Sequence, residues 1–94
     1  MNLQQTEFLL SIPTQEYLAM LYRQSKITGS VQINFIAAKL GLSPAAAAKT
    51  AQQLQETGFI RYEKYGMITL TQDGKRYGKQ LVAGSSEEYF LKNL

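Results

Sequence analysis

Three polar side chains at helical spacing carry hydrogen-bond groups of the kind that read the edges of bases. They are Lys49, Gln52 and Gln53. Lysine donates to guanine, and glutamine pairs with adenine, in the major groove of DNA. Ala45 and Ala46, one turn earlier, can make only apolar contacts, most usefully with a thymine methyl group. This set predicts that a helix over residues 43–56 lies in the major groove and reads few bases directly.

The residues before these side chains are suited to position that helix. Gly41 can end one helix in the left-handed conformation, Ser43 can cap the free amides of the next, and Pro44 suits its first position. A helix N-terminus carries partial positive charge, so Ser43 and Pro44 would lie against a DNA phosphate. One helix ending and another beginning within about three residues is typical of a helix-turn-helix.

The inner side of the same helix is predicted from its apolar spacing. Ala47, Ala51 and Leu54 share one face, which should point to the core. For Ala47, Ala48 and Ala51 the favoured interpretation is helix propensity with close helix packing. Ala45 and Ala46 remain candidates for the DNA-facing side.

The composition excludes several kinds of site. The 94 residues, 45 % of them hydrophobic, predict one folded domain. Because Cys and His are both absent, thiolate zinc sites, cysteine nucleophiles and imidazole acid–base chemistry are ruled out. We find no nucleophile with a base, no phosphate loop and no metal cluster, so we expect no enzyme, no cofactor and no small-molecule substrate.

The same composition bears on location. A chain without thiols fits a reducing cytoplasm. The start lacks the positive region of a secretory signal, and the apolar run 8–12 is too short to span a bilayer. We therefore expect a soluble cytoplasmic protein with no membrane contact.

Positive charge is concentrated in the second half of the chain. Residues 39–79 hold seven of the ten Lys and Arg but three of the seven Asp and Glu. This distribution suits a phosphate-binding face. Scattered, solvated lysines would give the same count, so charge alone leaves both interpretations open.

The remaining pattern predicts a mainly α fold with a small antiparallel β-hairpin. We expect a helix from an N-cap at Thr14 to about residue 25, a short strand at 31–32 and a helix at 33–40. Two β runs follow, 59–62 and 67–70, and the Gly66 between them suits a tight turn. With a last helix from about 71 to 82, this is a winged helix-turn-helix whose helices flank a wing sheet of two or three strands.

The hairpin, or wing, carries two further candidates for DNA contact. Lys64 lies at its expected tip and Arg61 on the strand below, and a lysine there can neutralise a phosphate without reading sequence. Protection of an edge strand by charge is the alternative. On the last helix, Lys75, Arg76 and Lys79 either contact the DNA backbone or solubilise the helix, and the sequence does not separate these.

Three stretches together resemble the DNA-binding domain of the diphtheria toxin repressor family, and its manganese-responsive repressors in particular. They are 13–18 with the helix-turn-helix up to Leu54, the wing 60–71, and the basic run 73–79. The resemblance covers about residues 13–82. It implies a dimeric, cytoplasmic transcription regulator that recognises a palindromic operator, and it also implies metal-dependent repression.

The chain departs from the family at the metal ligands that the resemblance implies. Glu16 fits the first carboxylate position, but the next ligand position is Ala19 and the histidine position falls near Ser85. We therefore predict a truncated family member without the metal site.

These inferences divide the chain into three parts and give one leading function. Residues 1–12 are an arm or short helix, 13–82 the DNA-binding domain, and 83–94 a short helix, with both ends candidates for a homodimer interface. The predicted function is a sequence-specific, dimeric DNA-binding repressor that uses helix 43–56 in the major groove and wing 60–70 on the backbone or minor groove. The alternative is a winged-helix assembly module that does not bind DNA, in which the alanine-rich face docks a partner protein.

Overall fold

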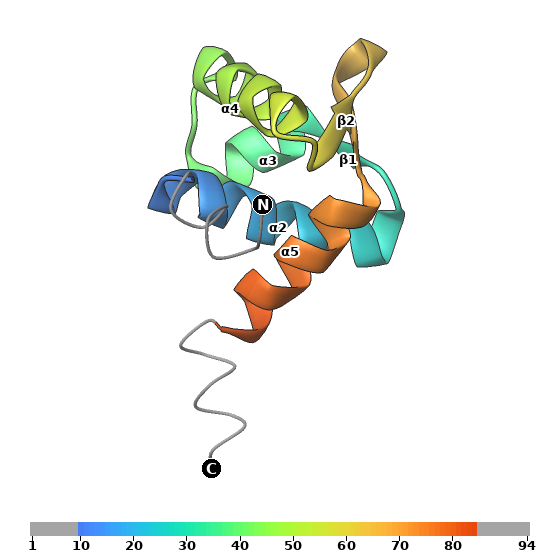
Figure 1. Ribbon diagram of the computed structural model, residues 1–94. Coiled ribbons are helices and arrows are strands. Elements are labelled where there is room, and N and C mark those ends of the chain that lie inside the picture. Colours follow the sequence, from blue (N-terminus) through green and yellow to red (C-terminus); the bar gives the residue numbers. More distant parts are fainter. Residues whose placement is uncertain (1–9, 85–94) are drawn as a thin grey trace.

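The computed structural model describes residues 10–84, which form four α-helices around a small sheet (Figure 1). In chain order the elements are α2 (Ile12–Thr28), β1 (Val31–Gln32), α3 (Ile33–Leu40), α4 (Pro44–Glu56), β2 (Ile60–Tyr62), the 3₁₀ turn η1 (Lys64–Gly66), β3 (Met67–Leu70) and α5 (Gln72–Ala83). The predicted arm 1–12 and terminal helix 83–94 fall largely outside the described residues.

Helix α2 begins earlier than predicted. Its N-cap is Ser11, whose side chain accepts from the Thr14 amide at 3.3 Å, and Pro13 occupies the first turn. The prediction that Thr14 caps this helix was wrong, because the Thr14 hydroxyl is buried and hydrogen-bonds to the Ser11 hydroxyl at 2.9 Å. The helix also continues past residue 25 and ends where Gly29 begins the turn into β1.

The sheet has three antiparallel strands in the order β1-β3-β2. Val31 lies opposite Ile68 in β1 and β3, and Ile60 lies opposite Leu70 in β2 and β3. The predicted strand at 31–32 is thus confirmed as an edge of the wing sheet. The β run predicted at 59–62 starts one residue later, at Ile60, with Phe59 buried just before the strand, and the run predicted at 67–70 forms with those bounds.

The core lies where α2 is covered by the other helices and the inner face of the sheet. Its largest fully buried side chains are Tyr17, Tyr77, Leu18, Leu21, Ile36, Leu54, Ile60 and Ile68. The rings of Phe59 and Tyr77 stack with centroids 5.2 Å apart, which joins the start of the wing to α5. Packing of this kind supplies most of the stability of helices this short.

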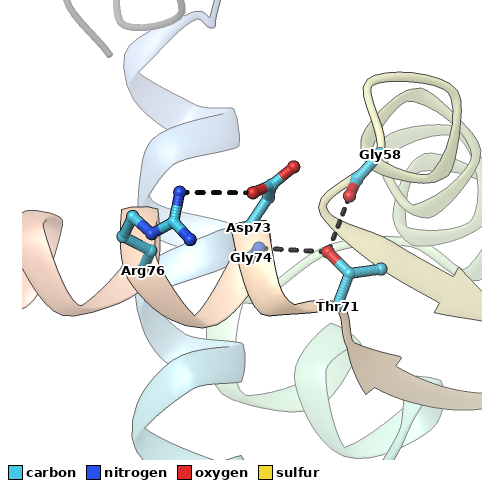
Figure 2. Close-up of polar contacts among 5 residues, drawn as sticks. All are labelled: Gly58, Thr71, Asp73, Gly74 and Arg76. Carbon is cyan, nitrogen blue, oxygen red and sulfur yellow. Dashed lines mark hydrogen bonds and ion pairs between the residues drawn. The ribbon is translucent and has the colours of Figure 1, made fainter. Parts of the chain in front are cut away.

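The base of the wing is fastened to α5 at Thr71 (Figure 2). The Thr71 hydroxyl donates to the Gly58 carbonyl at 2.6 Å and accepts from the Gly74 amide at 3.1 Å, so one side chain caps α5 and holds the turn after α4. Gly74 lies so close to this turn that an added Cβ would overlap the carbonyl oxygen of Phe59. The junction therefore fixes how the wing leaves the helices.

Figure 1 shows the consequence for the whole domain: α4 and the loop joining β2 to β3 both reach the upper side of the view, and α5 runs toward the lower side. Within residues 10–84, no helix combines the length and apolar character needed to cross a membrane.

Candidate nucleic-acid interface

The turn before α4 forms as its residues predict. Gly41 ends α3 in the left-handed conformation, with φ of 66°, and its amide bonds back to the carbonyls of Ala37 and Ala38. Ser43 is the N-cap of α4, and its hydroxyl accepts from the Ala46 amide at 3.1 Å. Ser43 and Pro44 are both exposed, so the N-terminus of α4 is open to a ligand.

The two sides of α4 separate as their spacing predicts. Ala47, Ala51 and Leu54 are completely buried. The outward side consists mainly of small and polar residues, with one cation, Lys49, and one anion, Glu56, in the last turn. The predicted contact residues Ala45, Lys49, Gln52 and Gln53 are exposed on it, and Ala46 is half-buried at its edge. Among them Gln53 is turned toward the start of α2, where it borders a shallow groove with Leu10, Ser11 and Thr14.

A buried hydrogen bond ties α4 to α2. The Tyr17 hydroxyl donates to the Ala47 carbonyl at 3.0 Å, across 30 positions of sequence. Burial, with a smaller contribution from the nearby Tyr62, raises the pKa of Tyr17 to about 12. The phenol therefore stays protonated throughout the neutral range and can act as a hydrogen-bond donor. This hydrogen bond joins the N-terminal part of α4 to α2.

The wing carries its charged residues on the outside. Arg61 on β2 and Lys64 in η1 are both exposed. The Gln55 side chain of α4 accepts from the Tyr62 amide at 2.6 Å, which joins the end of α4 to β2. Arg61 and Lys64 therefore sit on a hairpin whose placement relative to α4 is fixed by a direct contact.

Sequence reasoning missed Tyr65, which occupies the tip of the wing with 91 % of its surface exposed. Its φ of 63° and ψ of 20° are left-handed, a conformation that costs a bulky residue roughly 1–2 kcal/mol. The signal was present as an aromatic residue next to Gly66 between two β runs. A bulky residue at positive φ in an exposed turn points to a functional constraint.

A second basic cluster lies between α2 and α5. Lys26, Lys75, Arg76 and Lys79 border an open groove of about 450 Å³ there. Figure 2 shows the Arg76 guanidinium directed at the Asp73 carboxylate, 3.6 Å away and exposed. This pair contributes little to stability, since exposed ion pairs are screened by water. The cluster belongs to different elements from the α4 and wing residues.

The family described as "Iron dependent repressor, N-terminal DNA binding domain" matches residues 10–68. The chain belongs to this family. The matched residues run from the start of α2 into β3, and so contain the whole helix-turn-helix and most of the wing. The resemblance is confirmed, and with it the assignment to a family of DNA-binding repressor domains, although the basic run 73–79 that also carried the resemblance lies beyond the matched residues.

Curated relatives agree with this assignment. The HTH-type transcriptional regulator MntR of Bacillus subtilis (strain 168) is 32 % identical over 68 residues, which is 72 % of this chain and 48 % of the relative. MntR of Lysinibacillus sphaericus (strain C3-41) is also 32 % identical, over 72 % of this chain and 49 % of the relative. The chain thus spans about half the length of the curated relatives that it matches.

Solved structures confirm the winged-helix fold. ZitR of Lactococcus lactis superposes with a TM-score of 0.71 at 24 % identity, over 89 % of this chain and 56 % of that one. The MarR family regulator SPO1453 of Silicibacter pomeroyi gives 0.73 at 18 % identity, over 92 % and 62 %. At these identities the likeness is one of fold.

The family description names iron, but the described residues do not fit a metal ion. Iron and manganese need several carboxylate, imidazole or similar ligands converging on one point. Residues 10–84 contain no group of three or more His, Cys, Asp or Glu that could hold one. Glu16 borders a groove of about 390 Å³ together with Ala19, Met20 and the cationic Arg23. Ser85, at the implied histidine position, lies outside the described residues.

Proposed function

We propose that this chain is a sequence-specific transcriptional regulator that acts in the cytoplasm as a dimeric repressor and not as an enzyme. The observation that carries the proposal is the common direction of α4 and the wing, both of which reach one side of the domain (Figure 1). An α-helix fills the major groove, and a hairpin beside it then meets the backbone or the adjacent minor groove. Family membership supports the same use of these two elements.

In this proposal the candidate residues of α4 and the wing have different roles in DNA binding. Ser43, Pro44 and the amides of the first turn bind a phosphate, because that helix end is exposed and partly positive. Lys49 and Gln52 reach base edges, with Ala45 and Ala46 against thymine methyl groups. Gln53 reaches DNA only at the margin, since it borders the α2 side of the helix.

The wing cations supply affinity that is independent of sequence. Arg61 and Lys64 are exposed on the hairpin and bind phosphates. Because each neutralised phosphate releases counterions, the affinity should fall steeply with salt. A single domain makes few such contacts, and dimerisation doubles them while setting the spacing of two half-sites.

We further propose that the dimer forms through residues 1–12 and 83–94. Ile12, at the start of α2, is 70 % exposed, and it borders the 390 Å³ groove with Met20, Leu40 and Leu81. Gln15, Glu16 and Arg23 also line this groove, and a partly apolar surface of this kind near both ends of the described residues supports an interface there. Sedimentation equilibrium should give twice the chain mass, and Ile12→Glu should give the monomer.

Fluorescence anisotropy with labelled duplexes, over a series of salt concentrations, tests DNA binding. The duplexes are first enriched from a random library by the chain itself. We expect binding that weakens linearly on a log–log plot against salt. The double variant K49A/K64A should weaken binding, and the lost phosphate contact of Lys64 should lower the magnitude of the slope by about one. Lys26→Ala, a cation on the side of α2 and α5, is the matched control and should leave the slope unchanged.

Two results would contradict the proposal. One is the absence of any binding, even at low salt, by a folded chain. The other is binding that K49A/K64A leaves unaltered. If a partner protein captured by the wild type is lost with the surface variant Ala45→Glu while DNA does not bind, the assembly module is the correct function.

A further inference from the structure

The tip of the wing presents a tyrosine that the fold itself does not need. Tyr65 is the most exposed of the large hydrophobic side chains in residues 10–84, ahead of Ile27 at 78 % and Ile12 at 70 %. Its ring therefore contributes nothing to the described core. An aromatic ring held in water at the end of a hairpin is suited to pack against a binding partner.

The backbone at this tip places a bulky residue where tight hairpin turns usually carry Asn, Asp or Gly. Tyr65 is the one non-glycine residue of 10–84 with positive φ, and Gly66 after it has φ of 76°. Met67 donates to the Lys64 carbonyl to close the turn, and the Glu63 amide donates to the Met67 carbonyl at 2.8 Å. Glu63 and Lys64 on one side of the hairpin thus lie opposite Met67 on the other, which makes a β-bulge at the tip.

The tip is also fastened to the rest of the domain. The Gln32 side-chain amide donates to the Tyr65 carbonyl at 2.6 Å, while its oxygen accepts from the Asn34 amide at the start of α3. Gly66 lies against the Gln32 and Ile33 side chains so closely that an added Cβ would come within 2.7 Å of Ile33. The backbone conformation at Tyr65 is therefore fixed before a partner binds. This lowers the conformational entropy that binding must cost.

The chemistry of the ring favours one groove of DNA. A two-residue turn is narrow enough for the minor groove, roughly 6 Å wide, which excludes a helix. A phenol hydroxyl can donate to adenine N3 or thymine O2, the acceptors on the floor of that groove, whereas the guanine amino group would obstruct it. Lys64, the exposed residue just before Tyr65, would lie at the phosphates that border the same groove.

We propose that Tyr65 is a specificity-determining residue that enters the minor groove beside the α4 site and selects A·T over G·C pairs there. This rests on the proposed function, because it assumes that α4 and the wing bind one duplex. It assigns to the wing a reading role, in addition to the backbone neutralisation by Arg61 and Lys64.

Base substitution in the selected duplexes tests this role. An A·T pair next to the α4 footprint is replaced first by G·C and then by inosine·cytosine, which has the major-groove edge of G·C without the minor-groove amino group. We expect G·C to weaken wild-type binding roughly tenfold, the usual scale for one base pair, and inosine·cytosine to restore it. Tyr65→Ala should bind all three duplexes alike, with an unchanged salt slope because no charge is lost.

Two matched variants separate the ring from other effects. Tyr65→Asn keeps a side chain that tolerates the left-handed backbone, and it should lose discrimination as Tyr65→Ala does. Lys64→Ala should show the opposite result, with a salt slope reduced in magnitude by about one and discrimination kept. Thermal melting of each variant checks that the domain is folded.

The outcomes distinguish this inference from the proposed function. If Tyr65→Ala or Tyr65→Asn discriminates the three duplexes as the wild type does, or if inosine·cytosine binds as poorly as G·C, Tyr65 does not read the minor groove although the chain still binds DNA. If the wild type binds no duplex at low salt, both proposals fail. Retained discrimination in Lys64→Ala, with discrimination lost in both Tyr65 variants, supports the inference.

Discussion

Helix α4 and the wing point to the same side of the domain, but they are held there in different ways. Helix α4 rests on a continuous buried face, Ala47, Ala51 and Leu54, and on the hydrogen bond from Tyr17. The wing tip has no buried residue in η1 and is held by backbone contacts and the side chain of Gln32. The core therefore places α4, whereas a few polar contacts place the wing tip.

This difference separates stability from recognition. Changes on the inner side of α4 remove or crowd core packing and should alter the free energy of unfolding. Changes at the wing tip touch exposed residues and should alter DNA binding with little effect on stability. If α4 and the wing bind one duplex as proposed, the wing adds contacts to those of a helix that has few base-reading side chains.

Gly74→Ala should have the largest effect on the free energy of unfolding, because Gly74 lies at the junction where the turn after α4 and the base of the wing meet α5. The new methyl group would overlap the carbonyl oxygen of Phe59, and backbone on both sides must move. We expect a loss of roughly 3 kcal/mol in the free energy of unfolding, at the upper end for overpacking, measured by urea denaturation. Gly84→Ala, where φ is −89°, is the control, and an equal loss there would refute this explanation.

Ala51→Leu should have the next largest effect on the free energy of unfolding, and it changes packing at α4 alone. Ala51 is completely buried, so three extra carbon atoms must displace α2 or α4, at a cost of about 2 kcal/mol. Ala45→Leu, on the exposed side of the same helix, should leave urea denaturation unchanged within about 0.5 kcal/mol. Equal destabilisation by both substitutions would mean that α4 is not divided into an inner and an outer side.

Tyr17→Phe should cost about 1 kcal/mol, the usual value of one hydrogen bond, and should also change the response to high pH. The pKa of Tyr17 is raised from 10.0 to about 12 in the folded chain. Between those values the unfolded state loses its proton first, so the stability of the wild type falls as pH rises from 10 to 12, by roughly 2–3 kcal/mol. Denaturation at pH 9 and pH 11.5 should show a smaller fall in Tyr17→Phe than in the wild type. An equal fall in the stability of the wild type and of Tyr17→Phe would show that Tyr17 is not the group whose titration lowers stability.

Lys49→Ala and Lys64→Ala should have the smallest effects, and they compare α4 and the wing directly. Each side chain is exposed, so neither variant should change stability by more than about 0.5 kcal/mol. Each should reduce the magnitude of the salt slope by about one if its cation binds a phosphate. If Lys49 contacts a guanine edge instead, as in the proposed function, Lys49→Ala will relax the preference at one base pair rather than reduce the slope. An unchanged slope in Lys64→Ala would exclude the wing from the backbone contact.

The sequence predicted best those features that depend on neighbours in the chain. The turn at Gly41 and Ser43 follows from local capping rules, and it formed as expected. The N-cap of α2 was misplaced, because Ser11 and Thr14 both have capping side chains and only packing shows that the Thr14 hydroxyl is buried. Local rules do not decide between two such candidates.

The features that the sequence did not reveal depend on distant contacts. The left-handed Tyr65 is stabilised by Gln32 on another strand, and no local preference of tyrosine indicates it. The residues of α4 proposed to face DNA were chosen from periodicity, and the structure adds that Gln53 lies at the α2 margin. Their roles in binding stay predictions.

The strand order also affects the order in which parts of the domain fold. Strand β3 lies between β1 and β2 although it is the last of the three in the chain, and the bond from Gln32 to Tyr65 joins residues 33 positions apart. During synthesis, α2, α3 and α4 can assemble from contacts along neighbouring segments, whereas β1 waits unpaired until β3 has left the ribosome. Because closing a longer loop costs more entropy and slows folding, we expect the wing to be completed last.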